Sequence, residues 1–95
     1  MARVTWTEQA LDDLDAILLF IARDSTRYSQ LFTERVFAAA QQLVEFPMSG
    51  RVVPEFGQEH LRELIIQSYR IIYWFESDEA QILAVHHGAI PMEEA

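Results

Sequence analysis

Residues 61–75, LRELIIQSYRIIYWF, decide the fold of this chain. They contain two apolar runs, residues 61–66 and 69–75, which are rich in β-branched and aromatic side chains. Only the polar pair Gln67-Ser68 separates the runs. Two such runs around a two-residue polar turn indicate a β-hairpin.

Two further strands are predicted on either side of this hairpin. Residues 82–87 form a third apolar run after the polar segment 77–80, so a meander of three antiparallel strands is the simplest arrangement. Near the N-terminus, residues 3–7 are short, β-branched and aromatic, which is typical of a strand.

Two helices are predicted between the N-terminal strand and the hairpin. Thr7 offers its hydroxyl as an N-cap to the first helix, whose apolar residues recur every three or four positions until about Asp24. Ser25 or Thr26 can cap the second helix, which runs to residue 46 and is ended by Pro47. Residues 47–60 contain turn-forming proline and glycine and are expected to be an irregular loop.

The element order is therefore β-α-α-β-β-β. It defines an α+β fold in which a helical hairpin packs on one face of an antiparallel sheet. A length of 95 residues predicts one domain over residues 1–95, and residues 88–95 are expected to form a flexible tail.

Composition narrows the class of protein. Hydrophobic residues make up 51% of the chain, which excludes disorder, yet no apolar run is long enough for a membrane span. There is no cysteine and no N-terminal secretory signal, so we expect a soluble cytoplasmic protein without a membrane partner. The net charge of −8, with all seven basic residues arginine, disfavours nonspecific or direct sequence-specific binding to nucleic acid.

Strand alternation divides the side chains of the predicted sheet between two faces. The face toward the helices is expected to carry Leu64, Ile66, Tyr69, Ile71, Tyr73, Phe75, Leu83, Val85 and His87. The outward face is expected to carry Glu63, Ile65, Arg70, Ile72, Trp74, Ile82, Ala84 and His86. This outward face is more apolar than solvent requires, which suggests that something covers it.

The outward face also carries the candidate chemistry. RNA cleavage needs a base, an acid and cations for the phosphate, which His86, Arg70, Arg62 and Arg51 can supply in principle. The alternative is that His86 is an ordinary strand residue and that Arg70 pairs with Glu63 on the adjacent strand.

Trp74 has two interpretations, either as a binding anchor or as a core residue under the loop 47–60. His86 and His87 point to opposite faces of one strand, so they do not share a metal, and the sequence predicts neither a metal site nor a cofactor. His87 is expected to be a hydrogen-bonded core residue.

The order and spacing of several short motifs resemble the RelE/ParE superfamily of toxins, and ParE-type toxins in particular. The motifs are Val4-Thr5-Trp6-Thr7, Ala10-Leu11-x-Asp13-Leu14-x-x-Ile17, Ile21-Ala22-x-Asp24-Ser25, Phe46-Pro47-x-x-Gly50-Arg51-x-Val53-Pro54-Glu55, Leu61-Arg62-Glu63, Tyr69-Arg70-Ile71-Ile72-Tyr73 and Val85-His86-His87-Gly88-Ala89. They cover nearly the whole chain, and the resemblance implies the same β-α-α-β-β-β fold.

The resemblance further implies a toxin of a type II toxin–antitoxin pair, of the kind associated with plasmid stabilization and silenced by a cognate ParD-like antitoxin. ParE-like members inhibit DNA gyrase without being enzymes, whereas RelE-like members cleave messenger RNA in the ribosome with a cluster of cations. Only Arg70 matches that cluster here, and lysine is absent, so the gyrase inhibitor is the favoured expectation. A weakened toxin that retains only antitoxin binding is a further alternative, because Ile90 stands where many ParE-like sequences have arginine. The residues expected to bind a target or partner are Arg62, Arg70, Ile72, Trp74, His86 and Ile90.

Overall fold

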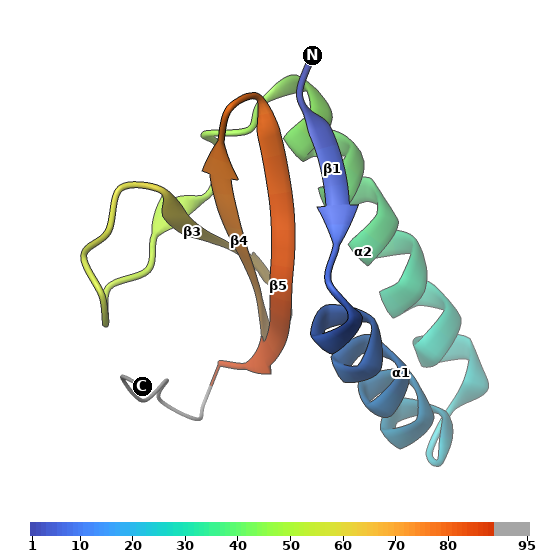
Figure 1. The fold of residues 1–95 in the computed structure, drawn as a ribbon. Coiled ribbons are helices and arrows are strands. Elements are labelled where there is room, and N and C mark those ends of the chain that lie inside the picture. Colours follow the sequence, from blue (N-terminus) through green and yellow to red (C-terminus); the bar gives the residue numbers. More distant parts are fainter. Residues whose placement is uncertain (89–95) are drawn as a thin grey trace.

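A computed structural model describes residues 1–88 and places two helices on one face of a five-stranded sheet (Figure 1). The elements are β1 (Arg3–Trp6), α1 (Glu8–Ala22), α2 (Thr26–Glu45), β2 (Arg51–Val52), β3 (Leu61–Ile66), β4 (Tyr69–Glu76) and β5 (Glu79–His87). This is the predicted α+β order with one addition, the short strand β2. Residues 89–95, including Ile90 and nearly all of the expected tail, lie outside the described residues.

The sheet is open and mixed, with strand order β1-β5-β4-β3-β2. The three long strands form the predicted antiparallel meander, while β1 pairs in parallel with β5 at one edge. At the other edge, Arg51 and Val52 pair with Glu63 and Arg62, so part of the segment expected to be irregular is a strand. Gly50 and Pro54 restrict this strand to two residues but do not prevent pairing with the free edge of β3.

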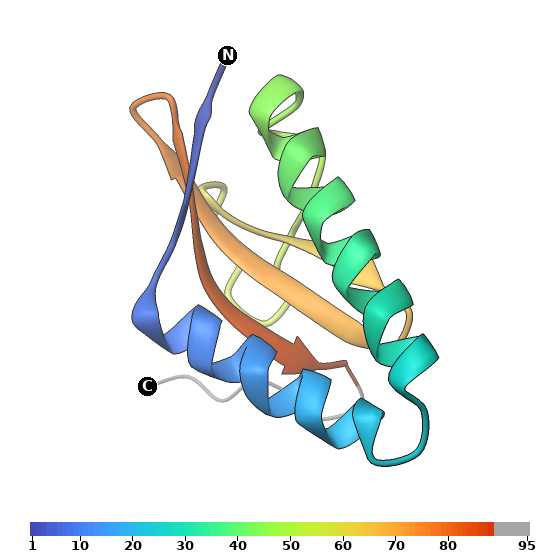
Figure 2. The ribbon, with the colours of Figure 1, turned by 90° about the vertical axis from the view of Figure 1, so that its right-hand side faces the viewer.

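The two helices form a hairpin that opens away from its tight connection (Figure 2). Each begins at a predicted cap: the Thr7 hydroxyl accepts a hydrogen bond from Ala10 N at 3.0 Å, and the Ser25 hydroxyl accepts one from Tyr28 N at 3.2 Å. α1 is further tied to the sheet because Val85 N donates to the Asp13 carboxylate at 3.0 Å. Neither helix is long and apolar enough to cross a membrane within the described residues.

Two tight turns join the meander. Gln67, which has a φ of 53°, and Ser68 form the predicted connection between β3 and β4. Between β4 and β5, Ser77 and Asp78 both have positive φ, 52° and 61°. β5 therefore begins at Glu79, three residues before the predicted start at 82, because the two left-handed residues complete the turn alone.

A register shift in β5 changes which of its side chains face the helices. Tyr73 pairs with Ile82 and Ile72 with Ala84, so Leu83 is the extra residue of a bulge. Ile82 is fully buried in the helix-side core, whereas strand alternation had predicted it on the outward face. The prediction was wrong because it assumed unbroken alternation along β5. The extra residue of the bulge lets both Ile82, before it, and Val85, after it, face the helices.

A strap, defined as residues 53–60, covers part of the outward face beside β3 (Figure 1). Its first residue, Val53, is fully buried, and Ile72 of β4 is only 2% exposed, although neither belongs to the core cluster under the helices. The last residue, His60, stacks on Trp74 with ring centroids 5.3 Å apart. The strap thus covers the part of the outward face around Ile72 and Trp74, whereas Ile65 stays exposed.

Candidate functional site

A cluster of two arginines and two glutamates lies on the outward face of the sheet. Arg70 Nε donates to Glu63 Oε1 at 2.6 Å. The two terminal nitrogens of Arg70 donate to the two carboxylate oxygens of Glu55 at 2.6 and 2.7 Å. Arg51 Nε donates to the second oxygen of Glu63 at 2.5 Å. Each glutamate therefore uses both of its carboxylate oxygens, and Arg70 is bound by both carboxylates. With two positive and two negative charges, the cluster is neutral overall.

The strand register explains why these side chains meet. Arg51 lies opposite Glu63, and Arg70 lies opposite Ile65, two residues further along β3. All of them point to the same face, at the diagonal spacing that long side chains can bridge. The predicted pairing of Arg70 with Glu63 is confirmed. Glu55 approaches from the strap, on the solvent side of Arg70.

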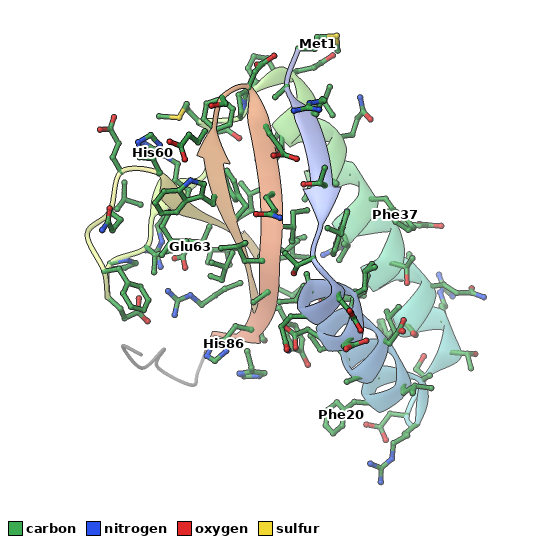
Figure 3. All side chains as sticks on the ribbon, in the orientation of Figure 1. Met1, Phe20, Phe37, His60, Glu63 and His86 are labelled. Carbon is green, nitrogen blue, oxygen red and sulfur yellow. The ribbon has the colours of Figure 1, made fainter. Side chains whose placement is uncertain are left out.

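The cluster is mostly withdrawn from water. Glu63 is 1% exposed and Arg70 5%, whereas the Arg51 side chain is 62% exposed. The hydrogen bonds that Arg70 donates to Glu55 are the largest cause that raises the pKa of Arg70, and burial alone would lower it. Arg70 is therefore a fixed cation whose charge is compensated within the chain. In Figure 3, Glu63 lies on the side of the sheet away from the helices.

A groove of about 890 Å³ opens beside this cluster. The cluster residues Arg51, Glu55 and Arg70 form part of its wall, and the remainder comes from Pro54, Ile65, Gln67, Ser68, Tyr69, His87 and Gly88. Ile65 is 54% exposed and supplies apolar surface. The groove thus combines an apolar wall with one bidentate ion pair, a combination suited to binding a partner side chain.

The two adjacent histidines occupy different positions. His86 lies opposite Arg70 on β4 and is partly exposed at the end of β5, where Figure 3 labels it. His87 lies opposite Tyr69 and makes an edge-on ring contact with it at 5.1 Å. Within residues 1–88, no group of three or more potential ligands is placed to hold a metal ion.

Trp74 is partly covered by the strap and partly open. Besides the His60 ring on its face, Trp74 donates its indole N–H to Glu76 at 3.0 Å. His60 is itself held by a 2.8 Å hydrogen bond between its Nδ1 and the carbonyl oxygen of Phe75. The loop therefore covers one side of the Trp74 ring, as the core interpretation predicted, and the rest of the side chain is still accessible.

The other residues predicted to bind a partner are engaged or lie elsewhere. Arg62 donates to the carbonyl oxygens of Gly50 and Glu59, both at 2.9 Å, so it connects the two ends of the loop. Ile72 lies on the predicted outward face but is buried there. Ile90 is outside the described residues. No contact in the structure tests the binding roles assigned to these residues.

A second surface of interest lies on the helices. Leu19 and Phe20 at the end of α1 are 71% and 60% exposed, and Phe37 on α2 is 60% exposed. In Figure 3, Phe37 projects from α2 away from the sheet, and Phe20 lies at the end of α1. Exposed large apolar side chains of this kind are typical of surfaces that bind another protein.

Sequence reasoning identified the outward face but missed part of the cluster. Glu63 and Arg70 followed from strand alternation, whereas Glu55 lies in a loop whose return path is set by tertiary contacts. Its signal in the sequence is its place at the end of the motif that runs from Phe46 to Glu55, which does not reveal what it touches.

The fold of this chain is shared with solved structures from toxin-antitoxin systems. A chain of the chromosomal ParDE TA system from P. aeruginosa superposes with a TM-score of 0.72 at 20% identity, over 92% of this chain and 96% of that one. A chain of the toxin-antitoxin complex RelBE2 from Mycobacterium tuberculosis gives a TM-score of 0.55 at 18% identity, over 90% and 96%. The architecture is therefore that of the RelE/ParE-like toxins.

Sequence comparison identifies the family. The model of the ParE toxin of the type II toxin-antitoxin system parDE matches residues 4–91. Toxin RelE2 of Caulobacter vibrioides is 36% identical over 90 residues, which cover 94% of this chain and 98% of that protein. The chain belongs to the ParE toxin family within the RelE/ParE superfamily, as its motifs predicted.

Proposed function

We propose that this chain is a cytoplasmic toxin that inhibits DNA gyrase by binding and that a cognate ParD-like antitoxin neutralises it. Family membership supports the toxin role. The observation that favours binding over catalysis is the state of Arg70, the one residue that matched the cationic cluster of RelE-like nucleases. Its guanidinium is held by two carboxylates, so an approaching phosphate would meet a neutral cluster.

Antitoxin binding is proposed at two surfaces. The exposed apolar side chains of α1 and α2 can receive an amphipathic segment, and the groove beside Arg70 can receive a side chain from the same partner. Trp74 and His86 are proposed as further contacts. Three further residues support antitoxin binding only by shaping the outward face, because they are hydrogen-bonded or buried in the free chain: Arg62, Arg70 and Ile72.

The alternative is a ribosome-dependent messenger RNA endonuclease. Two observations favour it: the name of the relative Toxin RelE2, and the placement of His86 opposite Arg70. In this alternative, His86 would exchange the proton and Arg70 would have to leave Glu55 to reach the phosphate.

Two assays on the purified chain separate these functions. Supercoiling by gyrase is measured in one and cleavage of a translated messenger in the other, each with and without the co-expressed antitoxin. The proposal expects loss of supercoiling, intact messenger and relief by antitoxin. Messenger cleavage that is lost in His86→Ala but retained in His60→Ala, a histidine that does not line the groove, would establish the nuclease instead.

A separate prediction concerns Ile90. If the missing cation weakens the toxin, Ile90→Arg should increase growth inhibition upon induction, measured as colony survival, at equal protein level. Ile90→Gln is the matched control, because it adds polarity without charge. Equal survival of the three chains would exclude this position as the cause of any weak toxicity.

A further inference from the structure

We propose that Glu55 occupies the binding position of an external carboxylate, and that an acidic side chain of a protein partner replaces it on Arg70. This inference goes beyond the choice between gyrase and messenger RNA, because it concerns an exchange within the groove. It identifies a binding site for a single carboxylate and a strap residue that keeps the site filled in the free chain.

The geometry on Arg70 is that of a receptor site with its ligand bound. Glu63, whose side chain is fully buried, holds Nε at 2.6 Å from beneath and fixes the plane of the guanidinium. The two terminal nitrogens are then directed at the groove, where Glu55 accepts from both at 2.6 and 2.7 Å. This parallel pair is the arrangement in which arginine recognises any carboxylate.

Glu55 is the replaceable member of the pair. It comes from the strap and not from the sheet, and its side chain is 25% exposed whereas that of Arg70 is 7% exposed. The strap is anchored at both ends, by Val53 N donating to Leu61 O at 3.0 Å and by His60 against Trp74. Rotation of the Glu55 side chain toward solvent therefore empties the site without detaching either anchor.

Charge determines what enters. With Glu55 in place the cluster of Arg51, Arg70, Glu55 and Glu63 is neutral, because two positive charges meet two negative ones. When Glu55 turns away, two positive charges face one negative charge, which leaves a single positive charge at the mouth of the groove. One carboxylate restores neutrality, whereas a phosphate dianion would leave an excess of negative charge beside buried Glu63.

Acetate is the probe for this site, and the NMR resonances of the Arg70 guanidinium are the readout. Glu55→Ala removes the internal competitor, so acetate should bind this variant at least about tenfold more tightly than wild type. Wild type should reach the same bound chemical shifts at higher acetate concentration, since the exchange is competitive. Glu59→Ala, which removes a carboxylate from the same strap, should titrate like wild type. Chloride at equal ionic strength should not reproduce the shifts.

Each other outcome overturns the exchange. If wild type never moves toward the acetate-bound shifts, Glu55 is a permanent structural ligand. If Glu55→Ala responds to acetate and chloride alike, there is no carboxylate site. If inorganic phosphate binds Glu55→Ala more tightly than acetate, the site selects a phosphate ligand such as RNA. Glu55→Gln, which preserves side-chain size, gives the same comparison should the alanine variant not fold.

Discussion

At the scale of single residues, the contact between Tyr73 and Gly50 ties the segment between α2 and β2 to strand β4. The fully buried Tyr73 donates its hydroxyl hydrogen to Pro47 O at 2.7 Å and accepts from Gly50 N at 3.0 Å. A Cβ at position 50 would lie 2.6 Å from that hydroxyl and 2.7 Å from the carbonyl oxygen of Glu63. Glycine is required at position 50 because a side chain would clash with the Tyr73 hydroxyl and the Glu63 carbonyl oxygen, both of which are held in place.

Gly50→Ala should therefore lower the free energy of unfolding by roughly 1–3 kcal/mol, the usual cost of overpacking a rigid site. Chemical denaturation measures this directly. Ser49→Ala changes the exposed residue next to it and should alter stability by less than about 0.5 kcal/mol. Equal stability of the glycine and alanine forms would mean that β2 can move away from Tyr73.

Tyr73 also predicts a dependence of stability on alkaline pH. Burial raises the pKa of its hydroxyl, so the folded chain keeps this proton after the unfolded chain has lost it. The stabilisation is complete below the ordinary tyrosine pKa and is lost as pH rises above about 10 toward the folded-state value. The free energy of unfolding should fall over that range.

Denaturation at a series of alkaline pH values tests this, with Tyr73→Phe as the diagnostic variant. That variant should be less stable at neutral pH by about 1–3 kcal/mol, because a buried and a partly buried backbone group lose a partner, and should show a flatter alkaline slope. Tyr28→Phe, at a side chain that is 67% exposed, should keep the wild-type slope. An unchanged slope in Tyr73→Phe would assign the titration to another group.

At the scale of elements, the turns and the bulge determine which side chains each strand presents. Ser77 and Asp78 both adopt the left-handed conformation without being glycine. The left-handed conformation costs a non-glycine residue about 1–2 kcal/mol of stability, and less when the side chain is short and polar. The turn is nevertheless formed because the long strands β4 and β5 pair on both of its sides.

The double change Ser77→Asn and Asp78→Gly should raise the free energy of unfolding by about 1 kcal/mol, because Asn-Gly is the preferred sequence of this turn. Thermal and chemical denaturation both report it. Ser68→Gly in the other hairpin is the matched control, since Ser68 is not among the residues with positive φ and should gain nothing. A gain of equal size at Ser68 would refute the conformational explanation.

At the scale of the whole molecule, a net charge of −8 surrounds a groove whose own charges cancel. Long-range attraction to another acidic protein is therefore weak, and the exposed apolar side chains of α1 and α2 are the available source of affinity.

The proposed antitoxin complex should consequently depend little on salt. Its Kd, measured by calorimetry, should change less than about tenfold between roughly 50 and 200 mM salt, whereas interfaces dominated by charge lose far more. Phe37→Ser should weaken the complex without changing the fold, and Phe46→Ser, at another exposed phenylalanine beyond the end of α2, is the control. A steep decline in affinity with salt would contradict an apolar interface.

The sequence by itself determined every described element except the short strand β2, because the signals of the others are local. Strand alternation, two capping hydroxyls and a two-residue polar turn specify β-α-α-β-β-β, and the motifs along the chain identified the family. The same alternation correctly placed Glu63 and Arg70 together on one face. Each of these inferences needs only residues that are near one another in the chain or in one hairpin.

Only the tertiary structure decided the rest. The bulge at Leu83 moved Ile82 into the core, since an inserted residue reverses alternation in a way that no local signal marks. Likewise, Glu55 reaches Arg70 across fifteen positions because the strap folds back along the sheet edge. Such contacts depend on how separate elements pack, and that packing decided that Arg70 is also paired with a second carboxylate, Glu55.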